Sequence, residues 1–109
     1  MAISYSPGTT QAMRNDLLTL EALALKQAVS LTITNRRHAG HPIIFARVRT
    51  IITELVVAAE VARVAWDMAR DDADLVRARD VVAEQCERAI ETLGAVLADV
   101  SAPETDTLH

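Results

Sequence analysis

The chain has 109 residues, which is enough for one hydrophobic core but too short for two independent ones. Its formal net charge of −4 argues against general nucleic-acid binding, so we expect no nucleic acid as a partner. The single Cys86 excludes an intrachain disulfide, and no basic region followed by an apolar run opens the sequence, so we expect a cytoplasmic location. The longest uninterrupted apolar run is the five residues 55–59, and we therefore expect no membrane-spanning segment and no membrane partner.

Alanine dominates the composition. Nineteen residues are Ala, and only three are aromatic, namely Tyr5, Phe45 and Trp66. Ala is the strongest helix former and packs without loss of side-chain rotamer entropy. This alanine-rich composition predicts an all-α fold of closely packed helices.

The first predicted helix covers residues 10–35, after a short tail of residues 1–9 and a cap at Thr9 or Thr10. Its apolar residues recur at three- and four-residue steps and so lie on one face: Met13, Leu17, Leu20, Ala24, Ala28 and Leu31. Residues 29–34 alternate apolar and polar and are rich in β-branched side chains, so an extended conformation is the alternative there. We interpret them as the end of the helix.

The clearest pattern is a heptad seam in residues 42–70. Its members follow alternating four- and three-residue steps: Ile44, Val48, Ile51, Leu55, Ala58, Ala62, Ala65 and Ala69. Pro42 suits the first helical position, where no backbone N–H is needed. This pattern predicts a long helix.

Further apolar residues of the same helix, among them Val57 and Val64, lie off this seam, so more than one face must be covered. The helix is therefore the central one, the contact between copies, or both. The candidate residues for an oligomer interface are Leu55, Ala58, Ala62, Ala65, Trp66 and Ala69.

A third helix follows Asp71, Asp72 and Asp74, whose carboxylates suit a helix N-terminus as caps and as charges that offset the dipole. Its apolar seam is Val82, Cys86, Ala89, Leu93, Val96 and Val100. We expect residues 10–100 to form a single helical domain and residues 101–109 a flexible acidic tail.

Three long helices joined by short connections predict antiparallel neighbours, either as an up-down-up bundle or as an extended hairpin with a third helix alongside. The heptad seam predicts coiled-coil-like packing. A second apolar face on the central helix favours self-association, so we expect a homo-oligomer.

Charge is segregated along the chain. No Asp or Glu occurs in residues 22–53, whereas residues 54–109 carry thirteen Asp and Glu against five Arg. The acid-free stretch contains the elbow between the first two predicted helices. The candidate residues there for binding an anion or a partner are Arg36, Arg37, His38, His41, Arg47 and Arg49.

Two interpretations of this elbow are open. The second helix has no acid in its first turn, which is typical of a site for a phosphate, a carboxylate or an acidic partner segment. Alternatively, Glu91 and Asp99 of the third helix pair with Arg47 and Arg49 inside the fold. The two arginines that end the first helix need no function, because they offset its dipole.

No catalytic or metal-binding constellation is visible. His38 and His41 are three residues apart, but zinc and iron sites need three or four ligands, and no Cys pair or His-Glu-x-x-His motif occurs. Cys86 lies on the inner seam of the third helix, where a free Cys behaves as a small apolar group. We expect no cofactor, no metal and no catalytic residue, which favours a non-enzymatic role without excluding an enzymatic one.

We interpret the chain as a helical interaction or assembly module that oligomerises through its apolar central helix and presents the basic elbow to a partner. An acidic protein surface is one candidate for that protein–protein interaction. The alternative is a small-anion or phosphate-binding helical protein with its site at the N-terminus of the second helix.

Overall fold

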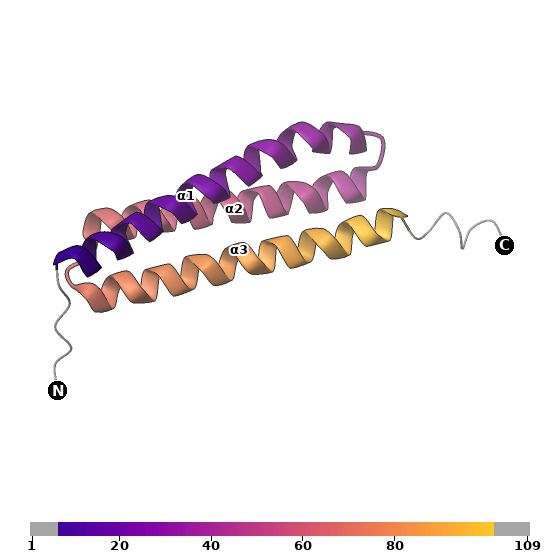
Figure 1. Ribbon diagram of the computed structural model, residues 1–109. Helices are drawn as coiled ribbons and strands as arrows, with labels where there is room; N and C mark the ends of the chain where they lie inside the picture. Colours follow the sequence, from indigo (N-terminus) through magenta and orange to yellow (C-terminus); the bar gives the residue numbers. More distant parts are fainter. Residues whose placement is uncertain (1–6, 102–109) are drawn as a thin grey trace.

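The computed structural model describes residues 7–101, and every regular element within them is helical. The elements are α1 (Pro7–Asn35), the short 3-10 helix η1 (Arg36–His38), α2 (Pro42–Met68) and α3 (Asp72–Ser101). The three long helices lie side by side as a rod (Figure 1). The prediction of an all-helical chain whose three helices pack against one another is confirmed. Most of the two predicted tails lies outside the described residues.

α1 begins at Pro7, three residues before its predicted start, so the prediction that Thr9 or Thr10 caps this helix is wrong. The physical reason is that Pro fits the first helical turn, where its fixed φ is already helical and its missing N–H is not needed. The Thr10 hydroxyl donates to Asp72 Oδ1 at 2.8 Å, which links the starts of α1 and α3.

Residues 29–34 are helical, although their pattern also allowed an extended conformation. The Thr32 hydroxyl donates to the Ala28 carbonyl oxygen at 2.7 Å, and the Thr34 hydroxyl to that of Ser30 at 3.1 Å. These bonds join residues four apart, as helical geometry requires, and satisfy the two hydroxyls within the helix. The helix ends at Asn35, as predicted.

Contacts at the two ends of the rod show which segments meet. Arg14, near the start of α1, donates through Nη1 to the backbone carbonyl of Trp66, near the end of α2, at 2.5 Å. At the other end Asn35, the last residue of α1, donates through Nδ2 to the Phe45 carbonyl in the first turn of α2, at 3.1 Å. The end of α3 lies on the same side as this elbow (Figure 1).

The core consists of the predicted apolar faces of the three helices. Near the start of α1 the buried residues are Met13, Leu17, Ala58, Ala62, Leu75 and Val82. Nearer the elbow they are Ala28, Val48, Ile51, Leu55, Ala89 and Val96. Leu75 lies outside the predicted seam of α3 and extends it by two turns. The small Ala residues of α2 allow the neighbouring helices to approach closely.

Two aspartates fix the connection between α2 and α3. The Asp74 backbone N–H donates to Asp71 Oδ1 at 2.9 Å, and the Arg70 backbone N–H donates to Asp74 Oδ2 at 3.1 Å. Such reciprocal bonds satisfy N–H groups that a helix start leaves without partners. The prediction of an aspartate cap at this helix is confirmed. Asp74 also forms ion pairs with the side chains of Arg70 and Arg77.

Leu55→Ala should lower the free energy of unfolding by about 2 to 5 kcal/mol, because it removes a fully buried side chain and leaves a cavity. Val56→Ala, at the next residue, where the side chain is 42% exposed, should change it by about 0.5 kcal/mol or less. Urea unfolding followed by circular dichroism measures both. Equal losses at the two positions would contradict the assignment of Leu55 to the core.

Asp74→Asn should make the stability less sensitive to acid. The hydrogen bond from the Arg70 backbone N–H, followed by that from the Arg70 side chain, holds the pKa of Asp74 below its ordinary value of 3.8. Ionised Asp74 therefore stabilises the fold above that value, and this contribution is lost as the pH falls from there towards the lowered pKa.

In urea unfolding at a series of pH values, the wild type should be more stable than Asp74→Asn at neutral pH, and the difference should shrink below about pH 4. Asp67→Asn, which changes an exposed carboxylate of α2, is the matched control and should show little difference at any pH. A wild-type advantage over Asp74→Asn that stays constant into acid would show that the charge of Asp74 does not matter.

Candidate functional site

The elbow between α1 and α2 is built on Asn35, whose side chain is 3% exposed. Its Nδ2 donates to the Phe45 carbonyl, and its Oδ1 is buried and has no hydrogen-bond partner among the described residues. His41 occupies the N-cap position of α2 without a side-chain capping bond, and Pro42 starts the helix as predicted. The first turn of α2 contains no acid, so its N–H groups remain uncapped by any side chain.

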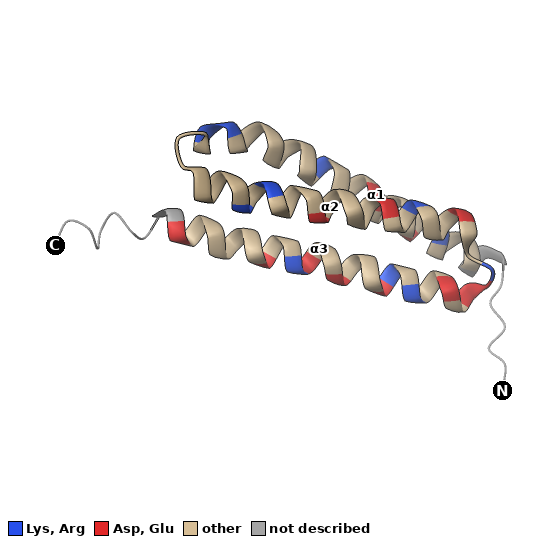
Figure 2. Cartoon of the chain, turned by 180° about the vertical axis from the view of Figure 1, so that it is seen from behind, with Lys and Arg blue, Asp and Glu red and all other residues tan. Residues whose placement is uncertain are grey.

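The candidate cations surround this elbow but do not converge. Arg36, Arg37, His41, Arg47 and Arg49 are exposed. His38, in η1, is half-buried. Figure 2 shows that the parts of α1 and α2 next to the elbow carry Lys and Arg only, whereas α3 carries charges of both signs. The site is therefore an exposed basic surface rather than a pocket lined by cations from several elements.

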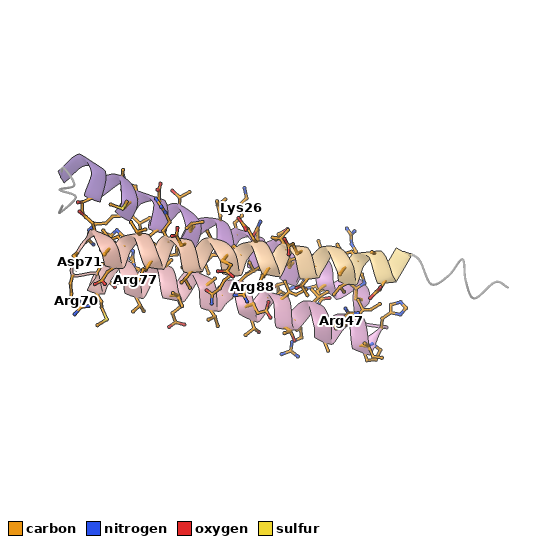
Figure 3. The ribbon with its side chains drawn as sticks, turned by 90° about the horizontal axis from the view of Figure 1, so that it is seen from below. Lys26, Arg47, Arg70, Asp71, Arg77 and Arg88 are labelled. Atoms are coloured by element: carbon orange, nitrogen blue, oxygen red, sulfur yellow. The ribbon has the colours of Figure 1, made fainter. Side chains whose placement is uncertain are left out.

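One of the two predicted internal ion pairs forms. Arg47 Nη1 lies 3.0 Å from Asp99 Oδ2, with side-chain exposures of 44% and 64%. Figure 3 shows Arg47 near the elbow end of the rod. Arg49 and Glu91 form no ion pair among residues 7–101. Arg49 follows Arg47 by two residues, about 200° around the helix, and so points away from α3. The interpretation that acids of α3 pair with the elbow arginines inside the fold therefore accounts for Arg47 but not for Arg49.

The geometry gives little support to a small-anion site. The hollow nearest Arg49 has a volume of about 270 Å³ and is lined by one stretch of α2 alone: Ala46, Arg49, Thr50 and Thr53. A phosphate site needs groups that converge from several elements. The unsatisfied Asn35 Oδ1 is a hydrogen-bond acceptor, which repels an anion rather than binding it.

The candidate interface residues of α2 face inward. Leu55, Ala58 and Ala62 are at most 1% exposed and pack within the two core clusters. Ala65, Trp66 and Ala69 are half-buried against the same core. Since these six side chains contact other helices of the same chain, a second copy would have to contact α2 mainly through different residues.

An apolar groove runs between α2 and α3, and two of the six half-buried or buried candidates, Ala65 and Ala69, also line it. It has a volume of about 570 Å³ and is lined by Val57, Glu60, Val61, Val64, Ala65, Met68, Ala69, Asp74 and Arg77. We call it the α2–α3 groove. Val57 also lines a more polar hollow of about 420 Å³, together with Thr50, Thr53, Glu54, Gln85, Arg88 and Thr92. The polar hollow therefore continues the groove towards the elbow.

Trp66 is engaged within the chain. The guanidinium groups of Arg14 and Arg63 lie 5.7 and 5.5 Å from its ring centroid, within the range of cation–π attraction. Its Nε1 is buried and has no hydrogen-bond partner within residues 7–101. The residue thus anchors α1 to the end of α2, and its ring is not presented to a ligand.

No arrangement for catalysis or metal binding appears in the described residues. Burial raises the pKa of the Cys86 thiol, which disfavours the reactive thiolate. Within residues 7–101 no three His, Cys, Asp or Glu side chains gather closely enough to hold a metal ion. His38 and His41 therefore have no further ligands beside them there.

Helix α1 is apolar over a long stretch, although charged residues interrupt it. The stretch Thr10–His38 is long and apolar enough, by length and composition, to cross a membrane, with a mean hydropathy of 1.3 in its most apolar window. Single charged residues interrupt an apolar run without greatly lowering such a mean. Only 17% of that window is buried within the chain.

Comparisons with protein-family models, with curated proteins and with solved structures found no match to this chain.

The Arg47–Asp99 pair should contribute little stability, because both side chains are largely exposed. In a double-mutant cycle with Arg47→Ala and Asp99→Ala, the coupling free energy should be about 0.2 to 1 kcal/mol and should fall as salt is added. The matched cycle pairs Arg49→Ala with Asp99→Ala and should give no coupling. Equal coupling in both cycles would mean that a general field, not this contact, links the charges.

Proposed function

We propose that the chain is a non-enzymatic interaction module: an antiparallel three-helix bundle that pairs with a second copy through the α2–α3 groove and presents the basic elbow to a partner. The observation that carries the proposal is the groove itself, which leaves large apolar side chains uncovered. The absence of a convergent polar site among the described residues supports a binding role over a catalytic one. The free Cys86 is compatible with the cytoplasmic location that we also propose.

The groove has the spacing of a second helical seam on α2. Val57, Val61, Val64 and Met68 follow steps of four, three and four residues, which is the pattern that packs against another helix. Val57, Val64 and Met68 are between 45% and 72% exposed. Because apolar surface of this kind gains about 25 cal/mol per Å² when it leaves water, a covering helix would stabilise it.

The charges beside the groove suit a second copy of the same chain. Glu60 lies on the α2 side of the groove, one helical turn before Val64, and Arg77 lies on the α3 side. A two-fold axis between Val61 and Val64 would bring each Glu60 to the Arg77 of the other copy, with one ion pair on each side. This charge complementarity favours a symmetric dimer over an unrelated partner.

The face of the rod is large enough for such a dimer. The 27 residues of α2 span about 40 Å, and two adjacent helices make a face about 20 Å wide, so the available area is about 800 Å² per copy. This matches the area that a stable specific interface buries on each side.

Val64→Glu should abolish self-association, because it would bury a carboxylate without a partner at the centre of the interface. We expect the dissociation constant of the dimer to rise by at least about 100-fold. Val56→Glu is the matched control, since it makes the same change on the same helix at a residue of similar exposure outside the groove. Sedimentation equilibrium at micromolar concentrations measures the dissociation constants.

The same measurement tests the two-fold register. Glu60→Arg should weaken the dimer, most strongly at low salt, because it places two cations together. Glu84→Arg, an exposed residue of α3 that does not line the groove, should leave the dimer intact. A wild-type chain that sediments as a monomer, or a loss of association with Val56→Glu but not with Val64→Glu, would overturn the proposed interface.

A further inference from the structure

We infer that the partner of the basic elbow is an anionic membrane surface, on which the elbow end of the α1–α2 pair lies. The inference rests on the elbow part of the proposed function and does not depend on self-association. It concerns residues that we call the elbow face: Leu25, Val29 and Ile33 of α1, Arg36 and Arg37 of η1 and Arg49 of α2.

The apolar part of this face belongs to a helix that is apolar on more than one side. Leu25, Val29 and Ile33 recur at four-residue steps and are between 42% and 59% exposed, while Ala24 and Ala28 are buried against the core. Most of the apolar window of α1 is therefore uncovered, as its low buried share also indicates. A helix of such composition is normally covered all round, so the outer side needs an apolar environment.

This side of α1 points away from α3. Leu23 and Gln27 line a hollow together with Ile90 and other residues of α3, and so mark the side of α1 that faces α3. Leu25 and Val29 each follow one of these residues by two positions, about 200° around the helix. They lie accordingly on the opposite side, remote from the many carboxylates of α3.

Cations without internal partners border the apolar residues. Arg36, Arg37 and Arg49 are exposed, and none forms an ion pair among residues 7–101. Lys26, also exposed, lies one residue after Leu25. Acidic residues are absent from positions 22–53, so α1, η1 and α2 place no negative charge among these cations (Figure 2).

The nearest acid on α2 also faces elsewhere. Glu54 lines the polar hollow together with Gln85 and Arg88 of α3, which puts it on the α3 side of the helix. The apolar part of the elbow face, on α1, is distinct from the α2–α3 groove, which no residue of α1 lines, whereas Arg49 lies beside Thr50 and Thr53 of the polar hollow.

The combination of features favours a lipid surface over an acidic protein. Exposed apolar side chains and cations on one surface suit a membrane interface, where the apolar groups enter the acyl boundary and the cations contact anionic headgroups. An acidic protein would match the cations but not the row formed by Leu25, Val29 and Ile33. Surface binding also leaves the core contacts of α1 intact, whereas spanning would strip α2 and α3 from its inner side.

The test is flotation of the full-length chain with vesicles of phosphatidylcholine alone and with vesicles that also contain phosphatidylglycerol. We expect binding to the anionic vesicles that weakens as salt rises from about 0.1 M to about 1 M. Because each cation near such a surface contributes a factor of about five, Arg36→Glu combined with Arg37→Glu should weaken binding by at least about thirtyfold. Arg63→Glu combined with Arg88→Glu makes the same change in net charge outside the elbow face and should retain most of the binding.

The apolar contribution is measured separately. Val29→Ser combined with Ile33→Ser leaves every charge in place and should weaken binding at low and at high salt, with the helical circular dichroism of the wild type retained. Val64→Glu, which tests self-association, should still float with anionic vesicles. Failure of the dimer and failure of lipid binding are thereby distinguished.

Three results would overturn the inference. Equal losses with the two arginine pairs would assign the effect to net charge alone. Absence of flotation, together with binding of a polyglutamate peptide that requires Arg36 and Arg37, would identify an acidic protein as the partner. Retention on the vesicles through high salt and alkaline carbonate, with release only by detergent, would indicate that α1 spans the bilayer rather than lying on it.

Discussion

Burial of one side of α2 is the constraint on which the rest of the structure depends. Its inner residues take part in both core clusters, and α1 and α3 each cover part of that side. Towards its C-terminal half the buried residues are Ala58, Ala59 and Ala62, so the neighbouring backbones can come close. The positions of α1 and α3, and hence the surfaces that α2 leaves uncovered, follow from this packing.

Much of the fold was predictable because helical periodicity identifies the side of each helix that is buried. The seams of the three helices were derived from spacing, and the aspartate cap of α3 from the ability of Asp carboxylates to accept hydrogen bonds at a helix start. The burial of Leu75 was not predicted, because charged residues separate it from the apolar seam that begins at Val82. The start of α1 was predicted three residues too late because residues 1–9 were assigned to a tail, although Pro7 suits a first helical turn.

The candidate site was less predictable, because a heptad seam shows that a face is covered without showing what covers it. Leu55 and Ala58 were assigned to a contact between copies, yet they meet other helices of the same chain. Asp99 was correctly placed near Arg47, since helix length fixes the level at which residues meet. The absence of an ion pair at Arg49 could not be predicted in this way. Whether a side chain meets α3 depends on its direction around the helix as well as on its level along it.

The single tryptophan gives this rod a built-in optical probe at one end only. Trp66 lies where the start of α1 meets the end of α2, held by the carbonyl contact and by the guanidinium of Arg14. Its fluorescence therefore reports on closure of that end, whereas circular dichroism averages over all three helices. Fraying at the elbow would change the circular dichroism and leave the Trp66 fluorescence unchanged. The two unfolding curves therefore coincide only if the bundle unfolds as one unit.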